Sequence, residues 1–158
     1  MKTIATIITF LLISGICTAQ STGFTAVGEK LIWENVFISN ETNITSIITR
    51  HSRLKIISVK GQVYKGVATG VSSSCPGTSK ALKSEYNFDF EIEASEGKYR
   101  VTVSNIKFVG KKAGSNADKL YIAGGTIKST KSNEADLACI DAYLNKVFTM
   151  TFVYKSRS

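Results

Sequence analysis

The strongest constraint on the fold of this chain is the alternation of apolar and polar residues within Tyr86–Phe108. In Tyr86–Glu93, every even position is aromatic or aliphatic and every odd position is polar or acidic. Tyr99–Val103 alternates in the same way, and Ser95–Gly97 lies between the two runs. Successive side chains of a strand point to opposite faces of a sheet, so this spacing indicates strands with one buried and one exposed face. The stretch therefore predicts a long β-hairpin.

The exposed face of this hairpin carries acids on one arm and bases on the other. Asp89, Glu91 and Glu93 face outward on the first arm, and Lys98 and Arg100 on the second. Opposite charges on neighbouring strands contribute about 0.2–1 kcal/mol per pair, which suffices to explain them as surface pairs that set the register. The alternative is that Glu91 and Glu93, about 7 Å apart on one strand face, are the acid and base of a small hydrolase. The bases opposite would keep both carboxylates ionised, so we favour surface pairs.

The rest of the secondary structure is predicted from periodicity, turns and caps. Beyond Val103 the alternation slips by one residue, which predicts a β-bulge near Ser104–Asn105. Further strands are expected over Lys30–Ser39, Leu54–Val59 and Gln62–Val71, with a short one over Leu120–Ala123 after a polar loop over Lys111–Asp118. Helices are expected over Thr42–Arg53 and from the capping residue Asn133 onward.

The predicted core joins the apolar face of the sheet to the last helix. The apolar stripe of that helix is Leu137, Ile140, Leu144 and Val147. The residues expected in the core are Trp33, Phe88, Phe90, Val101, Leu137 and Leu144. Residues 148–154 fit either an extension of the helix or an edge strand, and the pattern does not decide between them.

The N-terminus has the features of a secretory signal peptide. Lys2 precedes the apolar run Ile4–Ile16, which is shorter than the roughly 20 residues of a membrane span, and Cys17 and Ala19 fit a cleavage site. A lipoprotein acylated at Cys17 is the alternative, but Ile16 stands where a small residue is needed. We expect a signal peptide over 1–19, a flexible start over 20–29 and one α+β domain over 30–154. The mature chain should lack a transmembrane segment and be periplasmic or secreted.

The positive charge of the chain is unevenly distributed. Its formal net charge is +8, and no acid occurs between Glu41 and Glu85. The candidate polyanion-binding residues in that interval are Arg50, Arg53, Lys55, Lys60 and Lys65. A basic face attracts acidic polysaccharide, lipopolysaccharide or nucleic acid. A solvated basic surface is the simpler interpretation, because the bases are spread along the chain and not run together.

Two cysteines, Cys75 and Cys139, follow the signal peptide. In an oxidising compartment they favour a disulfide, which would close a loop of about 65 residues and stabilise the chain by about 4 kcal/mol. Two free thiols or a metal pair are the alternatives. A structural metal site usually needs four nitrogen or sulfur ligands, and His51 is the only histidine, so no metal site is expected.

Catalytic motifs are weak in this sequence. His51 lies on the apolar side of the first predicted helix and fits a packed residue better than a general base. The stretch GVSSSCPGTSK (70–80) resembles a phosphate-binding loop, but its glycine spacing is wrong and no Lys-Ser/Thr pair follows. We therefore expect no catalytic residue and no cofactor.

Three stretches and the order of elements resemble a family of secreted Gram-negative bacterial domains of unknown function with a TATA-box-binding-protein-like (TBP-like) fold. The stretches are LIWENVF (31–37), KGQVYKGVATG (60–70) and FDFEIEASEGKYRVTVSNIKF (88–108), of which the last is the most specific. The resemblance covers residues 30–147, and the chain departs from it in the loop with Cys75 and over Lys111–Ser132.

The resemblance implies an α+β fold with a curved antiparallel sheet and two helices packed on one face, in the order β-α-β-β-β-β-α. It implies no catalytic residues, and the fold does not imply DNA binding, because function depends on sites and not on folds. We expect a non-enzymatic binding or interaction module of the bacterial cell envelope. Its partner would be an envelope protein or an acidic glycan, with no nucleic acid expected. The alternatives are polyanion binding through the basic face and a small hydrolase that uses Glu91 or His51.

Overall fold

The computed structural model describes residues 22–39, 43–110 and 115–149. Its centre is an antiparallel sheet with the strand order β1-β2-β6-β5-β4-β3, and β7 pairs with the end of β6. The strands of this sheet are β1 (Phe24–Val27), β2 (Lys30–Ile38), β3 (Leu54–Lys60), β4 (Val63–Val71), β5 (Tyr86–Ser95), β6 (Lys98–Phe108) and β7 (Ser115–Asn116). The remaining elements are α1 (Ile44–Ile48), α2 (Ala117–Tyr121), α3 (Lys131–Phe148) and the small hairpin of β8 (Ile122–Ala123) and β9 (Thr126–Ile127).

The predicted hairpin is confirmed as β5 and β6, the two central strands of the sheet. Gly97 in its turn has φ 70°, a left-handed conformation that glycine adopts without a steric penalty. The expected bulge is also present, because the pairing of β5 with β6 shifts between Asn87 and Asp89. Asn105 in the bulge has φ 54°, a region that asparagine tolerates better than most residues.

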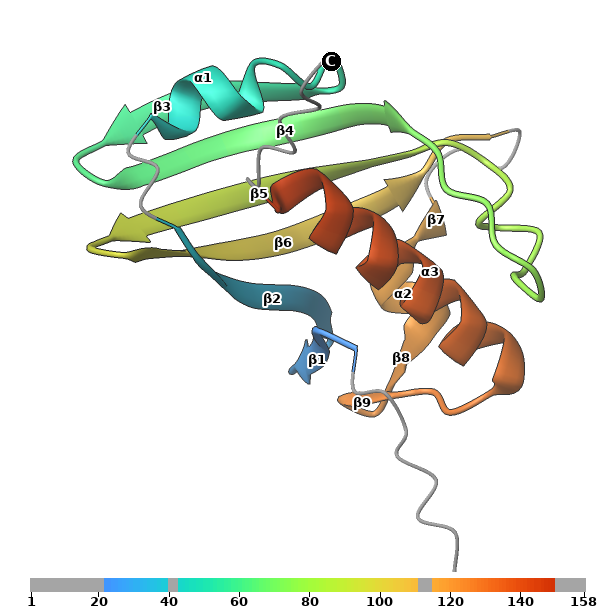
Figure 1. The fold of residues 1–158 in the computed structure, drawn as a ribbon. Coiled ribbons are helices and arrows are strands. Elements are labelled where there is room, and N and C mark those ends of the chain that lie inside the picture. The colour runs from blue at the N-terminus through green and yellow to red at the C-terminus, as the bar shows by residue number, and fades with distance from the viewer. Residues whose placement is uncertain (1–21, 40–42, 111–114, 150–158) are drawn as a thin grey trace, which may run out of the picture.

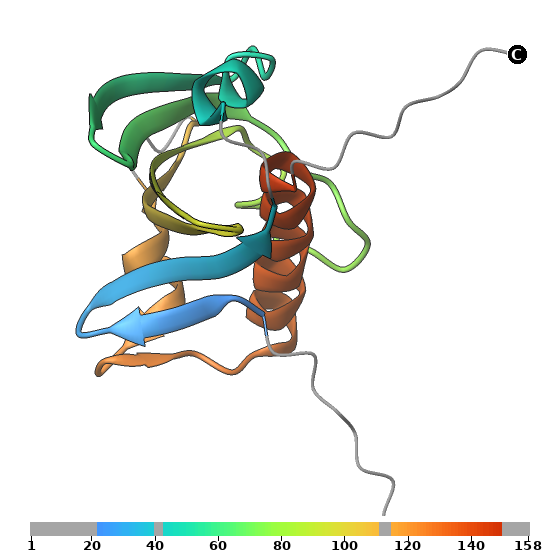
Figure 2. The ribbon, with the colours of Figure 1, turned by 60° about the vertical axis from the view of Figure 1, so that its left-hand side comes forward.

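Helices α1 and α3 lie on the same side of the sheet, and the strands bend around that side (Figures 1 and 2). We call this side the covered face and the opposite side the open face. The predicted fold, a curved antiparallel sheet with two helices on one face, is confirmed. Helix α2 and the hairpin of β8 and β9 were not predicted, and α2 contacts the ends of β6 and β2.

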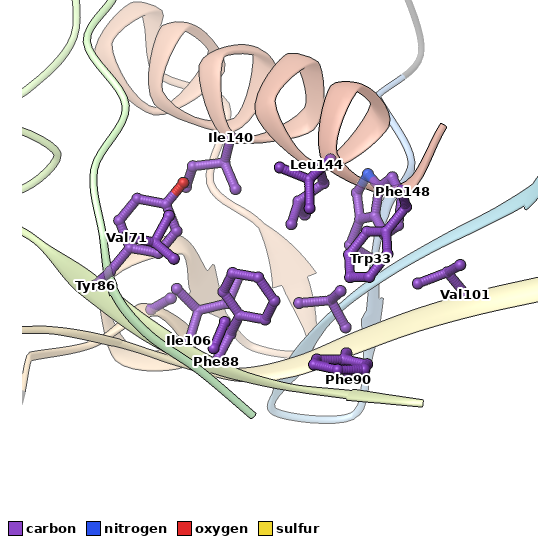
Figure 3. Packing of buried hydrophobic residues seen from close by; sticks show 14 of the residues in the cluster. Trp33, Val71, Tyr86, Phe88, Phe90, Val101, Ile106, Ile140, Leu144 and Phe148 are labelled. Carbon is purple, nitrogen blue, oxygen red and sulfur yellow. The ribbon is translucent and has the colours of Figure 1, made fainter. Parts of the chain in front are cut away.

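The core lies between α3 and the covered face. All six predicted core residues are buried, and so is the whole predicted stripe of the last helix. Figure 3 shows Ile140, Leu144 and Phe148 of α3 directed toward the aromatic side chains of the sheet. The Phe148 ring stacks on Trp33 with centroids 6.2 Å apart and meets Phe90 edge-on at 5.6 Å. Such ring pairs add about 0.5–1.5 kcal/mol beyond the burial of their area.

The polar flank of α3 attaches the helix to the N-terminal strands. The carboxylate of Asp141 accepts hydrogen bonds from the backbone N–H of Gly23 at 2.8 Å and from Nε1 of Trp33 at 2.7 Å. One turn later, Oδ1 of Asn145 accepts from the side-chain amide of Asn35 at 2.6 Å. The indole N–H of the fully buried Trp33 is therefore satisfied, as a buried donor must be.

A second carboxylate of α3, the fully buried Asp136, joins three segments of the chain. It accepts bonds from the backbone N–H of Ser79 at 2.6 Å, from the Ser79 hydroxyl at 2.5 Å and from the Tyr121 hydroxyl at 2.9 Å. Burial and the adjacent Asp136 charge raise the pKa of Tyr121 above its ordinary value. The loop between β4 and β5, helix α2 and helix α3 thus share one polar centre.

The first helix is much shorter than predicted. The expected helix over Thr42–Arg53 is wrong beyond Ile48, where α1 ends. The hydroxyl of Thr49 bonds back to the carbonyls of Thr45 and Ser46, and such local bonds compete with helix continuation. The N–H of His51 reaches the carbonyl of Ile48, three residues earlier, so a tight turn replaces the next helical turn.

Part of the expected flexible start is a strand. Residues Phe24–Val27 of the segment 20–29 form β1, with Phe24 opposite Trp33 of β2. Phe24 is buried, and Gly28, with φ 60°, makes the turn into β2. A run of four residues is too short for its alternation to be detected. The predicted signal peptide and residues 150–154 lie outside the described residues.

The segment before α3 also differs from expectation. The predicted strand Leu120–Ala123 is correct only for β8, because α2 takes the residues up to Tyr121 after Asn116 caps its start. The last helix begins at Lys131, two residues before the predicted cap. Thr130 is the actual cap, and its hydroxyl accepts the N–H of Asn133 at 3.2 Å.

The predicted disulfide between Cys75 and Cys139 is confirmed, with Cα atoms 5.9 Å apart. It ties the loop between β4 and β5 to α3, next to the contact of Ser79 with Asp136. The loop that it closes spans 64 residues of sequence. Among the described residues, no helix is both long enough and apolar enough to cross a membrane.

The double variant Cys75→Ala/Cys139→Ala should lower the free energy of unfolding by about 4 kcal/mol, because a cross-link over so long a loop removes entropy from the unfolded chain. Urea unfolding followed by the fluorescence of Trp33 measures the change. Dithiothreitol should bring the unmodified chain to the same midpoint and leave the variant unaffected. A loss below about 1 kcal/mol would contradict the expectation.

Candidate functional site

The open face of the sheet is the candidate functional site. No helix among the described residues packs on it (Figure 1). The side chains on this face include Glu34, Val36 and Ile38 of β2, Lys55, Ile57 and Lys60 of β3, Val63, Lys65 and Val67 of β4, Asp89, Glu91, Glu93 and Ser95 of β5, and Lys98, Arg100, Thr102 and Ser104 of β6.

The acids of the hairpin are paired on this face. Arg100 forms an ion pair with Glu93, directly opposite, and hydrogen bonding to Glu93 raises the pKa of Arg100. Glu91 pairs with Lys65 of β4 at 2.7 Å, so its partner comes from the neighbouring strand that the sequence did not single out. The predicted pairing across the hairpin is therefore confirmed for Glu93 with Arg100 and wrong for Glu91, whose basic partner lies on β4.

The third acid has a neutral partner. The Oδ2 atom of Asp89 accepts a hydrogen bond at 2.7 Å from Nδ2 of Asn105, the residue in the bulge. The bulge thus has a second effect besides the shift of register, because it brings an amide donor to the open face. All three acids of β5 are held in place by side chains of adjacent strands.

Two shallow hollows mark the open face. The larger, with a volume of about 350 Å³, lies between Ile57 of β3, Lys65 of β4, Asp89 and Glu91 of β5, and Thr102 and Ser104 of β6. The smaller, of about 290 Å³, is lined by Val36, Glu93, Ser95, Lys98 and Arg100. Both combine charged, hydroxyl and aliphatic groups, which suits recognition of a mixed polar and apolar surface.

Exposed apolar side chains on this face were missed by the sequence analysis. Val36, Ile38 and Ile57 are 48%, 83% and 64% exposed. A signal was present for the first two, because they occupy the positions of β2 that alternate with the core residues Trp33 and Phe37. Apolar residues at such outward positions stabilise no core and are the type of residue that a binding partner covers.

The two candidates for hydrolase chemistry are not brought together. Glu91 lies on the open face, paired with Lys65. His51 lies in the turn between α1 and β3, and α1 packs on the covered face through Ile44 and Ile48. The hollow that contains Glu91 is not lined by His51. Within the described residues, no group of three or more His, Cys, Asp or Glu side chains is placed to hold a metal ion.

The five predicted polyanion-binding residues fall into two groups. Lys55, Lys60 and Lys65 share the open face of β3 and β4. Arg50 and Arg53 lie outside the sheet, in the turn between α1 and β3. The structure therefore places three of the five on one surface, and their role in binding stays a prediction.

Comparison with known proteins identifies the fold. No protein-family model matches the sequence, and no curated protein matches it. A solved DUF4468 family protein from Bacteroides ovatus is 14% identical, with a TM-score of 0.54 over 80% of this chain and 86% of that protein. A TBP-like protein from Parabacteroides distasonis is 12% identical, with a TM-score of 0.50 over 76% of this chain and 91% of that protein. The chain has a TBP-like fold. Identities this low show the fold alone, and the fold expected from the sequence resemblance is confirmed.

A double-mutant cycle of Lys65→Gln and Glu91→Gln should give a coupling free energy of about 0.2–1 kcal/mol, because both groups are exposed and water screens their attraction. Urea unfolding of the four chains measures it, and about 0.5 M salt should reduce it. A matched cycle of Glu91→Gln with Lys55→Gln, whose partner strand is β4 and not β5, should show weaker coupling. Coupling that salt leaves unchanged would show that the pair does not act as a solvated surface contact.

Proposed function

We propose that the protein is an exported, non-enzymatic binding module of the bacterial cell envelope that recognises its partner through the open face. The observation that supports this is the difference between the two faces of the sheet, one buried under a helix and one exposed. The covered face buries its aromatic residues against α3. The open face presents charged, hydroxyl and aliphatic side chains around two hollows.

Export is supported by two independent features. Residues 1–19 have the charge, apolar length and small-residue end of a signal peptide. The disulfide between Cys75 and Cys139 is of the kind that persists in oxidising compartments such as the periplasm or the exterior. Both features support a periplasmic or secreted location.

The ion pairs of the open-face carboxylates support a binding role over a catalytic one. Glu91 and Glu93 each hold an ion pair with a base on an adjacent strand. A catalytic pair of carboxylates flanks a substrate cleft, whereas these two contact bases on an exposed strand face. The most acidic part of the open face is therefore suited to electrostatic recognition.

Polyanion binding is a second candidate, supported by the shared position of three lysines. Lys55, Lys60 and Lys65 lie on the open face of β3 and β4, and Lys55 and Lys60 form no ion pair among the described residues. Arg50 and Arg53 lie in the turn that precedes β3. An acidic glycan or lipopolysaccharide headgroup would be the ligand.

The main proposal is tested by site-specific photocross-linking in the cells that produce the protein. Benzoylphenylalanine at Thr102, in the middle of the open face, should give one discrete adduct in the periplasmic or secreted fraction. The matched control is Ala142 on the exposed side of α3, which should give none. The recovered chain should begin after Ala19, as its intact mass will show. Equal adducts from both positions, or a full-length chain retained in the cytoplasm, would contradict the proposal.

The polyanion candidate is tested with alginate and lipopolysaccharide as probes. The variant Lys55→Gln/Lys60→Gln should weaken binding by about tenfold and flatten its salt dependence, because two phosphate or carboxylate contacts are lost. The variant Lys80→Gln/Lys83→Gln removes the same charge from the loop between β4 and β5 and should change affinity little. Equal losses in the two variants would show that only net charge matters.

A further inference from the structure

Strand β2 has half of its outer edge free of any neighbouring strand within the described part of the chain. β1 pairs only with the first part of β2, from Lys30 to Trp33. The N–H of Glu34 still reaches the carbonyl of Gly23 at 2.9 Å. No described strand follows beside Asn35–Ile38 on that side. We call Asn35–Ile38 the free edge.

Backbone hydrogen bonds around the free edge show which groups point outward. The N–H of Glu34 points toward β1, and the N–H of Ser39 points the other way, to the carbonyl of Gly97 at 3.0 Å. N–H groups alternate in direction along a strand, so those of Val36 and Ile38 point away from β6. Among the described residues, the N–H of Val36 is bound only by Oδ1 of its neighbour Asn35, at 2.8 Å. An incoming strand can replace that local bond.

The other outer edges of the sheet carry protection that the free edge lacks. On β3, a register shift lies between Ile56 and Ser58, and Lys55 and Lys60 project from the strand. Bulges and lysines are the usual means of preventing strand addition. β1 is flanked by the hairpin of β8 and β9, where the N–H of Gly125 binds the Glu29 side chain at 3.0 Å.

The free edge also has apolar and charged groups in suitable places. Val36 and Ile38 are exposed and point to the open face. The 290 Å³ hollow lies beside them and is lined by Lys98 and Arg100. Arg100 is paired with Glu93, whereas Lys98, directly opposite Ile38, forms no ion pair with a described residue. An acidic side chain next to Ile38 would find an available ammonium group.

We propose that the free edge binds an extended segment of a protein partner, which joins the sheet as an antiparallel strand. An acidic side chain of that segment lies opposite Ile38, beside Lys98, and an apolar side chain lies opposite Val36. Backbone hydrogen bonds supply affinity in such strand addition, and alternate side chains supply specificity. The inference rests on the proposed binding function and names the chemical class of its partner.

Charge favours a segment of a foreign protein over the two other candidates for the free edge, which are residues 150–158 of this chain and a second copy of it. Residues 150–158 of this chain contain Lys155 and Arg157 but no acid, so they have no group to place beside Lys98. A second copy of the exported chain carries the same net charge, +7 once Lys2 is removed with residues 1–19 (19 minus 12), which opposes association. A foreign segment with an acid next to apolar residues meets neither obstacle.

The test uses the isotope-labelled chain from residue 20 and the peptide acetyl-Thr-Glu-Tyr-Val-amide, whose Glu, Tyr and Val would lie opposite Ile38, Phe37 and Val36. Titration followed by NMR should give saturable shifts at the amides of the free edge. The same peptide with Lys in place of Glu should bind about threefold more weakly, because one exposed ion pair is lost. Shifts spread over the whole sheet with equal affinity for both peptides would overturn the proposal.

Variants locate the binding and separate it from the proposed function. Ile38→Glu places a like charge opposite the Glu of the peptide and beside Lys98, and should weaken peptide binding by about tenfold without changing the melting temperature. Ile57→Glu, a matched change on β3, should bind like the unmodified chain. If Ile38 is protected from hydrogen exchange in the free chain and loses that protection on dilution or on removal of residues 150–158, the edge is already occupied and the proposal is wrong. An unaffected cross-link at Thr102 would then leave the function of the open face standing.

Discussion

The apolar side of α3 lies across the covered face of the sheet, where Ile140, Leu144 and Phe148 meet Trp33 and the aromatic residues of the central strands (Figure 3). Burial of one such side chain contributes about 1.5–3 kcal/mol, so this contact dominates the stability of the domain. It also fixes the register of every strand, because a slip of one residue would turn the aromatic set to the open face. The open face is then left with residues that the core does not need.

Apolar packing alone does not determine how α3 is oriented, and two carboxylates on the helix provide that information. Asp141 binds Trp33 and Gly23 of the N-terminal segment, while Asp136 binds Ser79 and Tyr121. Each contact is short, and removal of one partner would leave a buried polar group without a hydrogen bond. The disulfide lies beside the Asp136 contact, so the loop before β5 is fixed to the helix by one covalent and two polar links.

The sequence predicted the parts of the fold whose periodicity is long. The hairpin, the bulge at Asn105, the buried stripe of α3 and the disulfide could all be read from the residues. It failed where side chains compete with the backbone, as at Thr49, and where an element is only a few residues long, as in β1. For the site, alternation identified the acids, but no local pattern reveals that Glu91 pairs with Lys65, because strand order is decided by the packing of the whole sheet.

The open face and the free edge follow from one asymmetry of this sheet. Helix α3 covers apolar side chains of the sheet on one face. It gives no hydrogen-bond partner to the backbone N–H and C=O groups of a strand at an outer edge. Most of that edge is protected by β1, by the lysines of β3 or by the hairpin of β8 and β9. At Val36 and Ile38 the chain instead keeps exposed apolar residues beside the ammonium group of Lys98. These residues contribute little to the core, and the proposed addition of a partner strand would cover them.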